Sequence, residues 1–83
     1  MLIGKRYLAY QTLPIETFCS EYSSRAPISL TNRETNQYLK DVGLELPVHH
    51  REAFSYNRFL YVAGQEDNSD TIELIKVKQI IRN

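Results

Sequence analysis

Two stretches of the sequence repeat apolar residues at the spacing of a helix. In the first stretch, four apolar residues fall at intervals of three and four positions: Ile15, Phe18, Cys19 and Tyr22. Pro14 suits the first turn of a helix, and Pro27 disfavours helical geometry at the residue before it. The spacing therefore predicts a helix that begins near Pro14 and ends within residues 23–27, with one apolar face.

The second helical stretch carries its own start and stop signals. Thr31 and Glu34 form the capping-box pattern, in which each side chain satisfies a backbone N–H group at the start of a helix. An apolar stripe follows, made of Tyr38, Leu39 and Val42. Gly43 then stands where a residue with positive φ closes a helix. These signals predict a helix over residues 32–42.

The remaining apolar segments are typical of strands. Residues 2–10 are rich in β-forming side chains with partial alternation, and residues 28–30 are long enough for a short strand. Residues 58–63 and 71–81 are rich in β-branched and aromatic side chains on either side of the polar loop 64–70. This arrangement predicts a hairpin at the C-terminal end of the sequence.

Two segments allow a second interpretation. Asp70 and Glu73 can cap a C-terminal helix in place of the last strand. A strand there needs a bulge, because the apolar residues change sides between Leu74 and Ile75. After Gly43, Pro47 can open a third helix or start an extended segment that leads into the aromatic run.

The length of 83 residues leaves room for one domain, so we expect a single compact α+β domain over residues 1–83. It would hold two helices in its N-terminal half and a C-terminal β-hairpin. One cysteine excludes an internal disulfide framework and a Cys-based zinc finger, and we expect Cys19 to be a reduced, buried thiol. Apolar runs of a few residues are too short to span a bilayer, and no signal-peptide pattern opens the sequence, so we predict a cytoplasmic protein.

Charge modifies this picture through its distribution. The 10 Lys and Arg residues balance the 10 Asp and Glu residues, which removes the long-range attraction that usually brings a protein to nucleic acid. The predicted loop 64–70 is acidic, whereas the middle and the tail of the chain are basic. A neutral chain with this layout can still present a positive face.

The order of the predicted elements resembles a winged helix-turn-helix domain. The local pattern that supports the resemblance is Thr35-x-x-Tyr38-Leu39-x-x-Val42-Gly43-Leu44, with Gly43 as the turn glycine between paired helices. The resemblance implies a third helix in the major groove of DNA and a hairpin wing made by loop 64–70. A different compact α+β fold is the alternative.

If the resemblance holds, the residues that face bases and phosphates are His49, His50, Arg51, Ser55, Asn57 and Arg58. Lys5, Arg6, Lys76 and Lys78 would contact phosphates. The competing hypothesis is a small protein-binding adaptor or inhibitor, of the kind that phages and mobile elements encode. In that case the exposed contacts would be Tyr56 and Tyr61, since tyrosine is enriched at the centres of protein interfaces.

Catalysis is the third hypothesis. A metal-free ribonuclease needs a general base, a general acid and a cation, and the candidates are His50, Arg51, Glu52, Tyr56 and Arg58. Their spacing is not diagnostic, so we expect a non-enzymatic protein without a cofactor, a bound metal or a small-molecule substrate. The final strand can also pair with its copy in a second chain, which would make a homodimer.

Overall fold

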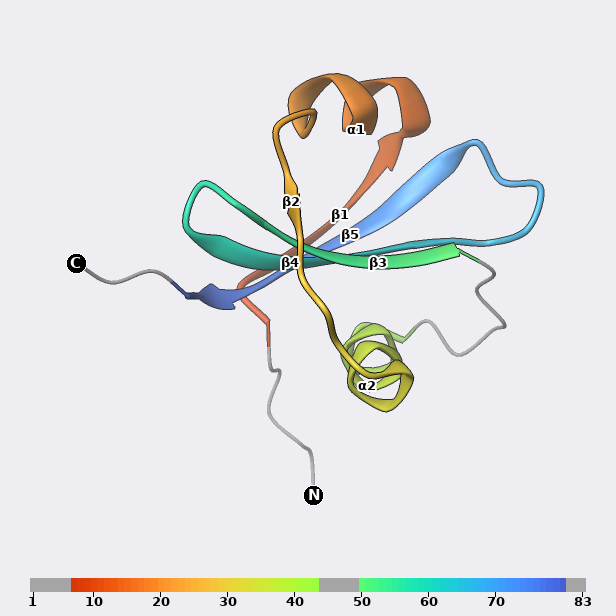
Figure 1. Cartoon of the computed structure of the whole chain (residues 1–83). Helices are drawn as coiled ribbons and strands as arrows, with labels where there is room; N and C mark the ends of the chain where they lie inside the picture. Colours follow the sequence, from red (N-terminus) through yellow and green to blue (C-terminus); the bar gives the residue numbers. More distant parts are fainter. Residues whose placement is uncertain (1–6, 44–49, 81–83) are drawn as a thin grey trace.

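The computed structural model describes residues 7–43 and 50–80 of the chain. These residues form, in chain order, β1 (Ala9–Pro14), α1 (Ile15–Glu21), β2 (Ala26–Pro27), α2 (Asn32–Asp41), β3 (His50–Tyr56), β4 (Phe59–Gln65) and β5 (Thr71–Gln79). The five strands make one antiparallel sheet in the order β1-β5-β4-β3-β2. Figure 1 shows α1 on one side of this sheet and α2 on the other.

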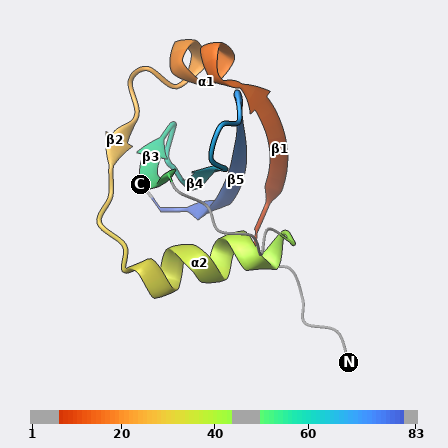
Figure 2. The same cartoon turned by 90° about the vertical axis from the view of Figure 1, so that its right-hand side faces the viewer.

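The sheet is therefore the middle of three layers. From β1 at one edge, the chain crosses one face of the sheet through α1 to reach β2 at the other edge, and α2 then runs back across the opposite face (Figure 2). Each face has its own core cluster. The cluster under α1 contains Phe18, Tyr22, Phe54, Tyr61, Ala63, Ile72 and Leu74. The cluster under α2 contains Leu39, Ala53, Leu60, Val62, Ile75 and Val77.

The predicted fold class, two helices in the N-terminal half and a C-terminal hairpin in a winged-helix-like arrangement, is wrong. Strands dominate the described residues, and the two helices only cover the faces of the sheet. The predicted C-terminal hairpin does form, as β4 and β5, but it is the centre of a larger sheet. Residues 50–56 complete that sheet as β3, so the segment proposed to form a recognition helix is extended where the structure describes it.

Several predicted boundaries also shift. The first strand covers Ala9–Pro14, several residues later than expected, and the short second strand is Ala26–Pro27. Residues 71–79 form a strand, so the alternative C-terminal helix does not occur there. Pro47 and the beginning of the first predicted strand lie outside the described residues.

Both predicted helices are confirmed. In α1, Phe18 and Tyr22 are buried, but Cys19 is exposed, so the expectation of a buried thiol is wrong. The capping box at the start of α2 is formed: Thr31 N–H donates to Glu34 Oε1 at 3.1 Å, and Glu34 N–H donates to Thr31 Oγ1 at 3.1 Å. Gly43 has a φ of +90° just after α2, as its predicted place at the helix end requires.

The bulge expected between Leu74 and Ile75 lies elsewhere. Both residues have no exposed surface, because neighbouring side chains in a strand point to opposite faces and both faces are covered. The register shifts two residues later, where Leu60 pairs with Lys78 and Tyr61 with Lys76. Val77 is the extra residue there, and the change of side in the sequence needed no bulge.

Candidate functional site

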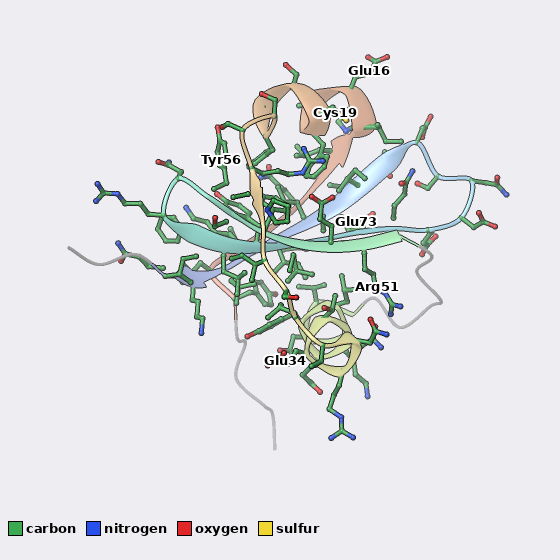
Figure 3. All side chains as sticks on the ribbon, in the orientation of Figure 1. Glu16, Cys19, Glu34, Arg51, Tyr56 and Glu73 are labelled. Carbon is green, nitrogen blue, oxygen red and sulfur yellow. The ribbon has the colours of Figure 1, made fainter. Side chains whose placement is uncertain are left out.

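The structure distributes the predicted site residues over the whole sheet. Arg51 lies in β3 on the face covered by α2, where its guanidinium donates a hydrogen bond to Asn36 Oδ1. Tyr56 lies on the opposite face, with α1, as Figure 3 shows. His50 is the first residue of β3, while His49 lies outside the described residues. These side chains do not converge on one site.

Four other predicted residues come close to each other at one end of the sheet. Asn57 and Arg58 form the two-residue turn between β3 and β4, and both have positive φ angles, 52° and 72°. Lys76 and Lys78 lie near this turn, because they pair with residues at the start of β4. We call this end, with Arg58, Lys76 and Lys78, the basic end.

The cations of the basic end do not share one face. Lys76 Nζ sits 4.0 Å from the ring centroid of Phe59, which packs on the cluster under α1. Lys78 is paired with Leu60, which belongs to the cluster under α2. The opposite end of the sheet carries Glu66, Asp67 and Asp70 in the loop between β4 and β5, and we call it the acidic end.

The two tyrosines proposed as exposed contacts belong to an aromatic cluster under α1. Tyr61 is 6% exposed and stacks on Phe54 with ring centroids 5.3 Å apart, so the expectation that it is exposed is wrong. Tyr56 is half-buried, and its ring lies 4.7 Å from that of Tyr22. Burial raises the pKa of both Tyr22 and Tyr61 above the usual 10.0, because the apolar surroundings disfavour the phenolate.

Arg25 links α1 to β3 in a way that the sequence did not suggest. Its Nε atom donates to Glu52 Oε2 at 2.6 Å, and its Nη1 atom donates to the carbonyl oxygen of Tyr22 at 3.0 Å. The guanidinium also lies 4.7 Å from the ring centroid of Phe18. Glu52, a candidate acid or base of the ribonuclease hypothesis, is therefore held in a structural ion pair.

A cavity of about 390 Å³ opens beside this ion pair, between α1 and the sheet. Its lining includes Ile15, Phe18, Cys19, Glu52, Gln65 and Ile72. Within the described residues, no group of three His, Cys, Asp or Glu side chains could hold a metal ion. Apolar side chains thus line the cavity together with the polar groups of Glu52 and Gln65 and the thiol of Cys19.

The outer edge of β1 has a different character. Among the described residues, the large apolar side chains that are exposed are Leu8, at 61%, and Tyr10, at 39%, and both belong to this edge. The Tyr10 hydroxyl and the Thr12 hydroxyl each donate to Glu73 Oε1 at 2.7 Å. Burial, and then the hydrogen bond to Glu73, raise the pKa of Tyr10. One carboxylate thus fixes two neighbouring side chains of the edge.

The backbone of this edge is also open. Ile15 N–H donates to Asp70 O at 3.1 Å. Hydrogen-bonded pairs alternate along an antiparallel ladder, so residues 9, 11 and 13 also direct their N–H and C=O groups towards β5. The N–H and C=O groups of Tyr10 and Thr12 consequently point away from the sheet, and no described strand lies beyond β1. At the other edge, β2 and the bond from Ile28 N–H to Ala53 O at 2.9 Å cover residues 53–55 of β3.

Sequence reasoning did not single out this edge. The expected strand over residues 2–10 ends before Thr12, so it does not contain the alternation of Tyr10, Thr12 and Pro14 on one face. The signal that could have identified it is this period of two running into Pro14, a residue that central strands exclude because it has no N–H.

None of the helices in residues 7–43 and 50–80 is long and apolar enough to cross a membrane, and the cytoplasmic location stays a prediction. Comparison with known proteins adds nothing to the geometry. No family model, no curated protein and no solved structure matches the chain.

Proposed function

We propose that this chain is a non-enzymatic protein-binding module, of the adaptor or inhibitor kind, that accepts a strand of a partner protein along the outer edge of β1. The observation that supports this proposal is the coincidence of two features on one edge. The exposed large apolar side chains Leu8 and Tyr10 lie beside the outward N–H and C=O groups of Tyr10 and Thr12. Strand addition uses both, since the backbone supplies affinity and alternate side chains supply specificity.

Side chains of the β1 edge are held in place by hydrogen bonds within the chain before a partner binds. Tyr10 and Thr12 already donate to Glu73, so their side chains lose little rotational freedom on binding. Free edges are usually protected by charged side chains, proline or bulges. β1 has no charged residue, and its proline, Pro14, stands at its end. The edge before Pro14 therefore combines open backbone groups with fixed side chains, which is what a strand-accepting surface requires.

The energies indicate how much a partner must add. Four backbone hydrogen bonds contribute about 1 kcal/mol each, and covering the exposed parts of Leu8 and Tyr10 contributes about 1–2 kcal/mol each. The total of about 6–8 kcal/mol is similar to the loss of rotational and translational freedom, which is at least about 4–15 kcal/mol. A partner that binds tightly therefore needs contacts beyond the paired strand.

Nucleic-acid binding is the competing function, and it has less support. The cations of the basic end lie on different faces of the sheet, and Lys76 is partly engaged by the ring of Phe59. Phosphate binding works best when several cations follow one track on the surface. The capture experiment below discriminates between the two functions.

The experiment captures partners from a nuclease-treated extract of the source cells on the tagged chain. We compare the natural chain with the double variant Leu8→Lys/Tyr10→Lys, which places two charges on the β1 edge. The matched control, Ser20→Lys/Ser23→Lys, adds the same charge at two exposed positions near α1. We expect a protein that the natural chain and the control retain in stoichiometric amount and that the edge variant loses.

Circular dichroism and thermal unfolding of each variant show whether the fold is kept. A partner retained equally by the edge variant would refute strand addition at β1. Without nuclease, retention of nucleic acid that is lost in Arg58→Ala/Lys78→Ala would replace the proposed function with nucleic-acid binding.

A further inference from the structure

The outer edge of β1 has a length and a pattern of hydrogen-bonding groups that fit a second copy of itself. We infer that the strand it accepts is β1 of a second copy of this chain, paired antiparallel about a two-fold axis. This inference rests on the proposed function, because it names the partner for the same edge.

The register follows from which groups point outward. Tyr10 and Thr12 each present one N–H and one C=O group. When Tyr10 of one copy lies opposite Thr12 of the other, each Tyr10–Thr12 pair exchanges two backbone hydrogen bonds. The two pairs together make four hydrogen bonds. The two Gln11 residues then face each other across the axis. Every outward group of the two residues is satisfied in both copies, as an isologous interface requires.

The same register brings the side chains of one face together. Tyr10, Thr12 and Pro14 alternate along β1, so their side chains share one face of the sheet. Tyr10 of one copy therefore comes opposite Thr12 of the other. Leu8, which is 61% exposed, directly precedes β1, and its N–H donates to Lys76 O at 2.7 Å. It flanks the paired segment at the end that Pro14 of the other copy reaches.

Pro14 and the start of α1 limit the length of a strand that can pair with β1. Pro14 has no N–H to donate, and α1 begins at Ile15, where the chain leaves the sheet edge. A partner strand can therefore pair only from the start of β1 to Pro14. β1 of a second copy has the same length and also ends at Pro14, where its own helix begins. It therefore fits this limit without a longer strand that would remain unpaired.

Charge favours the antiparallel arrangement. Lys76 is paired with Ala9 at one end of β1, while Asp70 accepts from Ile15 at the other end. Antiparallel copies bring the basic end of one sheet beside the acidic end of the other, whereas parallel copies would bring like charges together. The two β5 strands are three strand spacings apart, about 14 Å, so the attraction is largely screened at physiological salt and acts on orientation more than on affinity.

The first test measures the mass of the purified chain by analytical ultracentrifugation across a wide dilution series. Thr12→Pro removes the outward N–H at the centre of the edge. The matched control Thr12→Val keeps that N–H and removes the same hydroxyl bond to Glu73. We expect the natural chain and Thr12→Val to approach twice the monomer mass at high concentration, and folded Thr12→Pro to stay monomeric.

The second test fixes the register. In a Cys19→Ser background, Gln11→Cys places two thiols in a non-hydrogen-bonded pair across the axis, where Cα atoms are about 4.5 Å apart and a disulfide fits. We expect mild oxidation to cross-link Gln11→Cys into a dimer faster than the control Ser23→Cys. The inference would be overturned if the dimer persists in Thr12→Pro, or if Gln11→Cys cross-links no faster than Ser23→Cys.

The two proposals fail in different ways. A chain that stays monomeric at all concentrations, yet captures a different protein that the Leu8→Lys/Tyr10→Lys variant loses, contradicts self-pairing and supports strand addition. A chain that neither dimerises nor captures a protein contradicts both.

Discussion

The turn between β3 and β4 stores strain that one substitution should release. Asn57 and Arg58 have φ angles of 52° and 72°, and Tyr56 pairs with Phe59 directly outside them. This is the two-residue turn with positive φ at both central positions, which favours Asn followed by Gly. Asn57 suits its place, whereas Arg58 stands where glycine is preferred. We therefore predict that Arg58→Gly stabilises the fold.

The expected gain is the difference between two terms. A side chain with a Cβ atom in the left-handed region costs about 1–2 kcal/mol, which glycine avoids. Glycine gives the unfolded chain more freedom, which costs about 0.5–1 kcal/mol on folding. The net gain in the free energy of unfolding is about 0.5–1 kcal/mol, or a rise in Tm of about 2–8 °C for a domain of this size.

Urea and thermal unfolding followed by circular dichroism measure this gain. The control is Arg58→Ala, which removes the same charge but keeps the Cβ atom and its strain. The Arg58 carbonyl accepts from Ile80 N–H at 3.1 Å, and neither substitution removes this backbone acceptor. If Arg58→Gly is no more stable than Arg58→Ala, the argument from the left-handed region is refuted.

Three other predictions concern stability. Thr31→Ala removes the acceptor for Glu34 N–H and should lower the free energy of unfolding by about 1 kcal/mol in urea titrations, whereas Thr31→Ser should retain most of it. Arg25→Met should cost about 1–2 kcal/mol through the lost ion pair and ring contact, which is contradicted if Arg25→Met unfolds at the same urea concentration as the natural chain. Because burial raises the pKa of Tyr61 from 10.0, the unfolded chain loses this proton first as the pH rises, so stability should fall above about pH 10. Tyr61→Phe should make that fall shallower, and an unchanged pH profile would count against it.

Local signals predicted the helices well, for reasons that stay within a few residues of sequence. The capping box of Thr31 and Glu34 and the closing Gly43 act through the backbone of α2 alone. The apolar residues Phe18 and Tyr22 lie one turn apart on α1, so their burial follows from the period. Cys19 shares that predicted face, yet it lies at the border of the contact with the sheet and is exposed.

The sheet was harder to predict because its pairing is not local. Residues 58–63 and 71–81 were recognised as one hairpin, but the pairing of β1 with β5 joins opposite ends of the described chain. β3 reads ambiguously as well, since Pro47 and the polar residues Arg51 and Glu52 precede its buried part. Coverage of both faces also removes the alternation of apolar and polar residues that identifies strands in a sequence.

The candidate site was missed for a related reason. Arg, Asn and Tyr residues indicate a site through the chemistry of their side chains, but the fold uses several of them for structure: Tyr61 in the core and Asn57 in the turn. The open groups of Tyr10 and Thr12 belong to the backbone, and every residue type carries them. Only the position of β1 at the end of the strand order makes them available.

The pairing of β1 with β5 also affects how the chain folds. Thr12 lies opposite Glu73, and the contact cannot form until β5 has left the ribosome. Closing a loop of this length has an entropic cost that grows slowly with length, and sheets dominated by such distant pairs fold in milliseconds to seconds. Until then the cluster under α1 lacks Ile72 and Leu74, the residues that β5 supplies. A chain cut before β5 would therefore leave β1 unpaired on both sides, and we expect such fragments to aggregate instead of persisting as soluble intermediates.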